Sequence, residues 1–177
     1  MNKKTSSKTK SIVEIPEELI SNELSSLYEI ASENLFKSLD IAGQGGILKK
    51  DIIEALEARG ILKNDPRISD TVEKLNKFKD TETINPKQFH DVIVSNITLI
   101  EKALKGDLII PDFSSFAKKV KDVFEDIRSN QSGNVADYIP QLARVNPDYY
   151  AISVCTVDGQ QFHLGDYEVP YSIQSTS

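Results

Sequence analysis

The fold of the first half of the chain is decided by residues 85–100, NPKQFHDVIVSNITLI. Asn85 and Pro86 form a typical helix start, and Gln88 stands where the partner of a capping box belongs. A stripe then recurs at i, +3, +4, +7, +8 and +11, formed by Phe89, Val92, Ile93, Asn96, Ile97 and Ile100. The stretch therefore predicts an amphipathic helix with one face buried in a core.

Four further segments show apolar residues at helical spacing. They begin near Leu27, Lys49, Asp65 and Phe113. In that order, their apolar stripes are Leu27, Ile30, Ala31, Leu35 and Leu39; Ile52, Ile53 and Leu56; Ile68, Val72, Leu75 and Phe78; and Phe113, Phe116, Ala117, Val120, Phe124 and Ile127. Asp65 and Pro66 suit the N-cap and first helical positions, and Gly60 suits a helix stop. We expect a helical domain over residues 25–128.

The composition excludes several classes of protein. The 177 residues include 27 acidic and 21 basic ones, a net charge of −6, which argues against a general nucleic-acid binder. No apolar run approaches the length that a membrane-spanning helix needs. Cys155 is the one cysteine, which excludes an internal disulfide framework and a cysteine-based zinc cluster and favours a reducing compartment. We expect its thiol to be buried and inert.

Residues 1–10 carry four lysines and no acidic residue. They lack the apolar stretch of a secretory signal, and they lack the arginines and apolar face of a transit peptide. We expect residues 1–24 to be a disordered basic tail and lead-in.

The pattern changes at residues 129–134, SNQSGN, a polar linker between two domains. A short helix is expected over residues 135–145 and a strand over residues 149–157. Asp158 and Gly159 are typical of a hairpin turn, so residues 161–164 form the returning strand. Residues 135–177 are too few to bury a core of their own, so this second domain looks incomplete.

The first two helices invite comparison with a calcium-binding helix–loop–helix unit. The window 40–51 has Gly45 at its sixth place, but Ala42 and Leu48 stand at two ligand places, and a short aspartate replaces the glutamate at the twelfth. The second candidate loop, residues 80–85, is shortened. We therefore expect an EF-hand-like fold with no metal site.

The serines at the end of the chain are the candidates for covalent chemistry. In the Ser-x-x-Lys pattern a lysine one helical turn after the serine acts as the base. Ser172 has a serine at +3, and for Ser175 the +3 position falls one residue beyond the last. These residues alone leave a serine-rich tail and a nucleophilic serine both open.

Two sets of motifs, taken together, resemble one enzyme family. The segments VADYIPQLA (135–143), VCTVDGQ (154–160) and IQS (173–175) are similar to the start of the serine-dependent glutaminase domain. Upstream, NDPR (64–67), SNI (95–97) and IIPDF (109–113) resemble the EF-hand-like domain that precedes it in animal-type glutaminases. The similarity runs from about Ser25 to Gln174.

The resemblance implies a fold and a set of site residues. It implies an α-helical EF-hand-like domain followed, over residues 135–177, by the beginning of an α+β domain like that of β-lactamases and penicillin-binding proteins. Ser175 would be the nucleophile, and Tyr138, 37 residues earlier, would assist proton transfer and touch the substrate. Gln174 would contact the amino-acid end of the substrate. The lysine base and the other site residues of the family would follow Ser177.

The resemblance also implies a reaction and its partners. The substrate would be L-glutamine, hydrolysed to L-glutamate and ammonia without metal or organic cofactor, by a homotetramer that phosphate activates. The family suggests a mitochondrial location, and a cytoplasmic one is the alternative. The chain as given ends at the nucleophile and is expected to be inactive by itself. A helical EF-hand-like binding module with a remnant of the catalytic domain is the competing hypothesis, and a calcium sensor is a weaker one.

Overall fold

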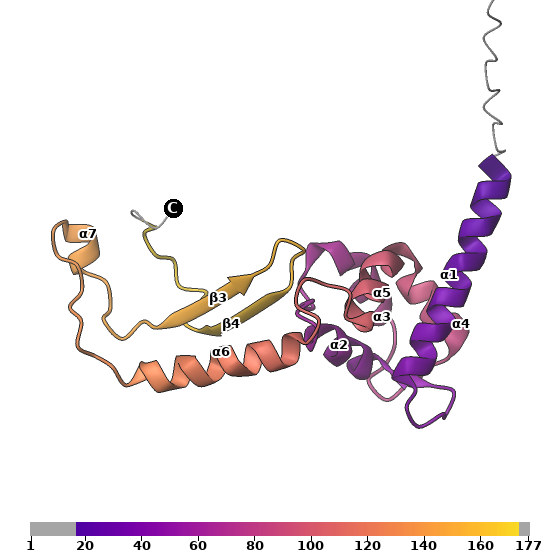
Figure 1. Cartoon of the computed structure of the whole chain (residues 1–177), viewed down its shortest axis with the longest axis horizontal. Helices are drawn as coiled ribbons and strands as arrows, with labels where there is room; N and C mark the ends of the chain where they lie inside the picture. Colours follow the sequence, from indigo (N-terminus) through magenta and orange to yellow (C-terminus); the bar gives the residue numbers. More distant parts are fainter. Residues whose placement is uncertain (1–16, 174–177) are drawn as a thin grey trace, which may run out of the picture.

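The computed structural model describes residues 17–173. Its helices are α1 (Glu17–Leu39), α2 (Lys49–Glu57), α3 (Ser69–Leu75), α4 (Pro86–Ile93), α5 (Ile97–Lys105), α6 (Phe113–Arg128) and α7 (Pro140–Ala143), with the short 3-10 turns η1 (Pro66–Ile68) and η2 (Val94–Asn96). Its strands are β1 (Ile47–Leu48), β2 (Thr83–Ile84), β3 (Ala151–Cys155) and β4 (Gln161–Gly165). Helices α1–α5 form a bundle at one end, and α6 and the β3–β4 hairpin extend side by side towards the other (Figure 1).

The bundle has one hydrophobic core, and the fold-deciding segment lies in it. Phe89, Ile93 and Ile100 are fully buried, and the ring of Phe89 meets that of Phe36 edge to face, 5.7 Å between centroids. The Asn85 side chain accepts from the Gln88 amide and the Gln88 side chain accepts from the Asn85 amide, so the capping box is confirmed.

The helix expected across residues 89–100 is interrupted. Helix α4 ends at Ile93, η2 follows, and α5 begins at Ile97. The Asn96 side chain lies at this break, where it accepts from the Thr71 hydroxyl at 2.8 Å and donates to the carbonyl of Arg67. Asn96 thus ties the break to α3 and η1 instead of packing as a stripe residue.

The two helix–loop–helix units are joined by a short antiparallel pairing of β1 and β2. Ile47, the eighth residue of the first loop, pairs with Ile84 of the second, and both are buried. This cross-loop pairing fixes the two units against each other and is consistent with the expected EF-hand-like arrangement.

Helix α1 is longer than the bundle that it packs on. It begins at Glu17, ahead of the expected start at residue 25. Leu35 and Phe36 are buried, whereas Leu27 and Ile30 are 58% and 56% exposed, so their expected place in the core is wrong. Tyr28 and Ala31, the residues next to them in the sequence, do pack against the core, so Leu27 and Ile30 lie beside the buried face of α1 and not on it.

Helix α6 belongs with the hairpin instead of with the bundle core. The core cluster runs from Leu35 to Leu108 and contains no residue of α6. Instead the buried ring of Phe124 stacks on Tyr150, 4.3 Å between centroids, and the Tyr150 hydroxyl donates to the Phe124 carbonyl. The expected union of all five stripes in one core is therefore wrong for α6.

The expected β-hairpin is confirmed, with Ile152 opposite Leu164 and Val154 opposite Phe162. Gly159 adopts φ +85° in the turn, a conformation that favours glycine. In the described residues β3 and β4 form a two-stranded sheet, and Ala151, Ser153 and Cys155, on one of its faces, are exposed. Cys155 is accordingly exposed, and its expected burial is wrong.

The helix expected over residues 135–145 is limited to the four residues of α7, which starts at Pro140. Within residues 17–173, no helix is both long enough and apolar enough to cross a membrane.

Candidate active site

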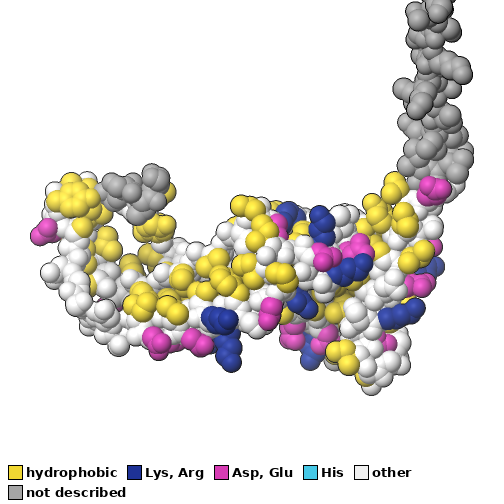
Figure 2. Space-filling model, viewed as in Figure 1, with side chains coloured by type: hydrophobic (Ala, Val, Ile, Leu, Met, Phe, Trp, Pro, Cys, Tyr) yellow, Lys and Arg dark blue, Asp and Glu magenta, His cyan; other side chains and the backbone are white. Residues whose placement is uncertain are grey.

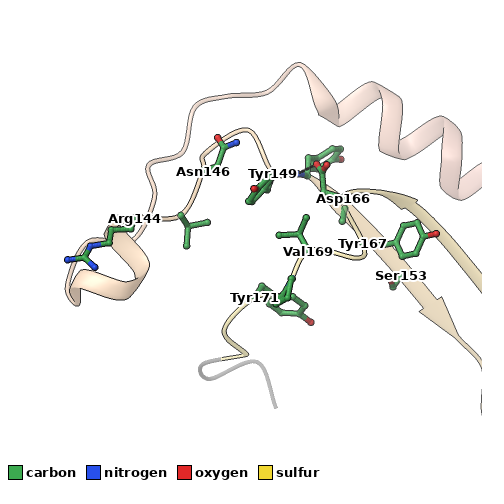
Figure 3. A pocket seen from close by; sticks show the side chains of 12 residues that line it. Arg144, Asn146, Tyr149, Ser153, Asp166, Tyr167, Val169 and Tyr171 are labelled. Carbon is green, nitrogen blue, oxygen red and sulfur yellow. Dashed lines mark hydrogen bonds between the residues drawn. The ribbon is translucent and has the colours of Figure 1, made fainter.

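The open end of the β3–β4 hairpin borders a cavity of about 560 Å³. Its walls come from the segment after α7, from the start of β3, and from the segment after β4 (Figure 3). Four of the lining residues are tyrosines, and the charged lining residues are Arg144 and Asp166. The principal side chains are Arg144, Asn146, Tyr149, Asp166, Tyr167 and Tyr171. Hydrophobic side chains lie on both sides of this hollow on the surface (Figure 2).

Backbone contacts close the hairpin at this end. The Asp166 amide donates to the Tyr150 carbonyl at 3.1 Å, and the Asp166 carboxylate accepts from the Tyr150 amide at 3.0 Å. Gly165 has φ +70° and lies so close to the Tyr150 carbonyl that a β-carbon would overlap it. These contacts hold the two segments that form opposite walls of the cavity.

The structure describes one of the three site residues predicted from the sequence. Tyr138 is 69% exposed, lies two residues before α7, and is not among the residues that line the cavity. Gln174 and Ser175 lie outside the described residues 17–173. Tyr171, four residues before Ser175, lines the cavity, so the chain that leads to Ser175 passes this hollow.

The structure contains a serine–histidine pair that the sequence analysis does not predict. Ser153 on β3 faces His163 on β4, with 3.0 Å between the Ser153 hydroxyl oxygen and His163 Nδ1. The other ring nitrogen lies 3.3 Å from the side-chain oxygen of Gln161, and the ring stacks on Tyr167. A two-residue turn at Asp158 and Gly159 would place Ser153 opposite Leu164, and it is the observed three-residue loop, residues 157–159, that brings Ser153 opposite His163. The second contact is an amide, whereas an orienting carboxylate is what a Ser-His-Asp triad requires.

The Asp40 and Asp80 carboxylates of the two EF-hand-like loops are bonded to groups of the protein itself. The Asp40 carboxylate accepts from the Gln44 amide at 2.9 Å and from the Gly45 amide at 2.7 Å. In the second loop the Lys49 ammonium lies 2.6 Å from Asp80 and donates to the carbonyl of Phe78. This contact lowers the pKa of the Asp80 carboxyl. Across residues 17–173, no three His, Cys, Asp or Glu side chains cluster as a metal site would require.

Comparison with known families divides the chain in the same order. Residues 31–111 match the family described as "EF-hand domain", and residues 133–177 match the family "Glutaminase". The segment from 133 to 177 belongs to the glutaminase family. The EF-hand match ends before α6, at the point where the core of the bundle also ends.

Three relatives that carry the name glutaminase align with 44% to 75% of the chain. The mouse protein "Glutaminase liver isoform, mitochondrial" is 36% identical over 137 residues, which are 75% of this chain and 23% of that protein. The nematode Caenorhabditis elegans protein "Putative glutaminase 3" is 38% identical over 145 residues, covering 75% of this chain and 24% of its own length. A cyanobacterial "Glutaminase" from Nostoc is 46% identical over 77 residues, 44% of this chain and 23% of its own. The chain thus spans about a quarter of the length of these relatives.

Proposed function

We propose that this chain is the N-terminal part of an enzyme that hydrolyses the side-chain amide of L-glutamine to L-glutamate and ammonia. The observation that carries the proposal is the order of two matches in one chain, an EF-hand domain over residues 31–111 and glutaminase sequence over residues 133–177. Relatives that carry the glutaminase name align across both parts. The bundle followed by a hairpin agrees with that order.

In the proposed mechanism the hydroxyl oxygen of Ser175 attacks the side-chain carbonyl carbon of glutamine. A base takes the hydroxyl proton, the C–N bond breaks, and the protonated nitrogen leaves as ammonia. A glutamyl ester on Ser175 remains, and water hydrolyses it to release glutamate and restore the hydroxyl. The backbone amide of Ser175 would stabilise the oxyanion.

The other roles follow from the resemblance. Tyr138 would assist proton transfer, and Gln174 would contact the amino-acid end of the substrate. A Ser-x-x-Lys base would occupy the position after Ser177, in a domain of the β-lactamase-like fold. The cavity at the open end of the hairpin supports the role of Ser175 alone, because its volume is in the range of small-molecule sites and Pro170 and Tyr171, a few residues before Ser175, line it; Tyr138 does not.

The quaternary part of the proposal rests on the resemblance alone, and the cellular part rests on the resemblance and on the names of relatives. The complete enzyme would be a homotetramer that phosphate activates, with no cofactor. A mitochondrial location is suggested by the names of the mouse and rat relatives, and a cytoplasmic location is the alternative.

The test is to express the complete reading frame that encodes this chain beside residues 1–177 and to measure ammonia release from glutamine. We expect turnover from the former and none from the latter, because a serine without its base loses several orders of magnitude in rate. Ser175→Ala should abolish the turnover of the longer protein. Turnover by residues 1–177 that disappears in Ser175→Ala would contradict the expected inactivity of this segment.

A second candidate is a helical binding or regulatory module with a remnant of the catalytic domain. The observation that favours it is the core of the bundle, which is complete between Leu35 and Leu108 and needs no residue of the glutaminase segment. The coding sequence after Ser177 separates the two hypotheses: a lysine as the next residue, with a few hundred residues beyond it, decides for the enzyme.

A further inference from the structure

The turn between β3 and β4 inserts into the helical bundle. It enters between residues 59–67, which follow α2, and residues 109–111, which precede α6; we call these two loops the turn socket. Figure 1 shows the hairpin turn reaching the bundle at this end. The Gln161 amide donates to the carbonyl of Gly60 at 2.7 Å, so the returning strand is bonded to the socket as soon as it begins.

Gln160 is the residue of the turn that the socket encloses. Its side chain is 1% exposed, in a loop between two strands where a glutamine is ordinarily solvated. Its amide nitrogen donates to the carbonyls of Arg59 and Ile110, both at 2.9 Å, and its amide oxygen accepts from the Ile110 amide at 2.9 Å. Both amide donors and the acceptor oxygen are therefore used by one loop or the other.

Arg67 binds the backbone of the turn from the other side. Its guanidinium donates to the carbonyl oxygens of Asp158 and Gly159. Asp65, whose side chain is buried, orients the guanidinium through contacts of 3.0 Å to Nε and 2.7 Å to Nη2. The Asp158 carboxylate in turn accepts from the Ile109 amide at 2.7 Å. Charged groups on each side thus hydrogen-bond backbone groups on the other, and hydrogen bonds with one charged partner are stronger than those between neutral groups.

Two glycines make the close approach possible. A β-carbon on Gly60 would lie 2.7 Å from the Phe113 ring and 2.8 Å from the Gln160 side chain. A β-carbon on Gly159 would overlap the Arg67 guanidinium. Both residues also have positive φ, +82° and +85°, so the backbone conformation and the lack of room for a β-carbon both favour glycine at these positions.

We propose that the turn socket is a recognition site for the Asp158-Gly159-Gln160 turn, with Arg67 and Gln160 as its determinants. The helical domain is then a binding partner of the hairpin and not a module that α6 merely tethers to it. An isolated two-stranded hairpin is marginally stable in water, and the socket supplies the contacts that it lacks. The inference goes beyond the proposed function and holds whether or not the chain belongs to an enzyme.

The test is amide hydrogen exchange, followed by NMR on residues 1–177, in the wild type, Arg67→Ala and Arg67→Lys. Arg128→Ala is the matched control, since Arg128 is exposed at the end of α6. We expect the amides of Ile109, Ile110 and Gln161 to exchange about tenfold faster or more in both Arg67 variants, because lysine lacks the fork that reaches Asp65 and the turn together. The core amide of Phe89 should stay within about twofold of its wild-type rate, and the control should match the wild type throughout.

Three results would overturn the proposal. The first is unchanged exchange at Ile109, Ile110 and Gln161 in Arg67→Ala. The second is acceleration of the Phe89 amide by the same factor, because Arg67 would then act through global stability. The third is wild-type protection in Arg67→Lys, because a charge alone would then suffice.

Discussion

Replacing Gln160 by methionine should lower the free energy of unfolding by about 3–5 kcal/mol. Methionine keeps the length of the side chain but removes the amide, so the carbonyls of Arg59 and Ile110 and the amide of Ile110 each lose a partner. A buried backbone group left without its hydrogen bond costs about 1–3 kcal/mol, and three such groups at the low to middle part of this range give the stated total. Gln160 is 1% exposed, and Arg59 and Ile110 are half-buried, so water has limited access to the groups that the amide leaves.

The assay is urea unfolding of residues 1–177 followed by tyrosine fluorescence. Five of the six tyrosines lie between residues 138 and 171, so this signal reports mainly on the region that contains the hairpin. With a slope of about 2 kcal/mol per molar urea, the midpoint should fall by about 1.5–2.5 M. Gln131→Met, in the exposed linker, is the control and should change the free energy by less than about 0.5 kcal/mol. If the free energies of unfolding of the two variants differ by less than about 1 kcal/mol, the hydrogen bonds of Gln160 do not hold the turn in the turn socket and the reasoning fails.

Three further predictions test the EF-hand-like loops, the turn socket and the proposed active site. Calcium should leave the melting temperature unchanged, because the Asp40 carboxylate already accepts from two backbone amides and Asp80 already pairs with Lys49. A rise of several degrees at micromolar calcium that Asp40→Ala abolishes would contradict this. Acid should release the hairpin. The Arg67 hydrogen bond lowers the pKa of Asp65; burial raises that of Asp158, but the hydrogen bonds from Thr156 and Ile109 together outweigh it and lower the pKa. Protection of the Ile109 amide should therefore persist above pH about 4 and decline progressively below it, and constant protection down to pH about 2 would refute the assignment. In the complete enzyme, Tyr138→Phe should reduce kcat by roughly 10²–10⁴ with little change in melting temperature; a lowered melting temperature with near-normal kcat would make Tyr138 a structural residue.

Local signals in the sequence predicted local structure well. The capping box at Asn85, the N-cap at Asp65 and the glycine in the turn after Asp158 all appear in the structure. Each of these features is decided by residues within a few positions of one another, so spacing and residue type are sufficient.

Features that depend on distant parts of the chain could not be predicted in this way. The helical spacing at Leu27 and Ile30 is genuine, but the core contacts the adjacent face of α1, at Tyr28 and Ala31, and spacing alone does not identify that face. Cys155 alternates as a strand residue should, and its exposure follows from the two-stranded sheet. Arg67 contacts a carbonyl 91 positions later, a link that no local pattern contains.

The candidate site residues were predicted from the resemblance to the glutaminase family and not from residue spacing or periodicity. Ser175 and Gln174 were nominated by the segment around residues 173–175, and the structure describes the chain only as far as Ile173. The cavity beside Tyr149 and Tyr171 depends on the hairpin end and the segment after α7 coming together, which periodicity does not reveal.

The most direct test of the central claim is to look for the glutamyl ester on Ser175. The complete enzyme would be mixed with glutamine, quenched in acid during turnover, digested, and examined by mass spectrometry. The account predicts that the peptide containing Ser175 gains the mass of one glutamyl group, and that Ser175→Ala shows neither the adduct nor ammonia release. Ammonia release that continues in Ser175→Ala, with no adduct on the wild-type peptide, would contradict it.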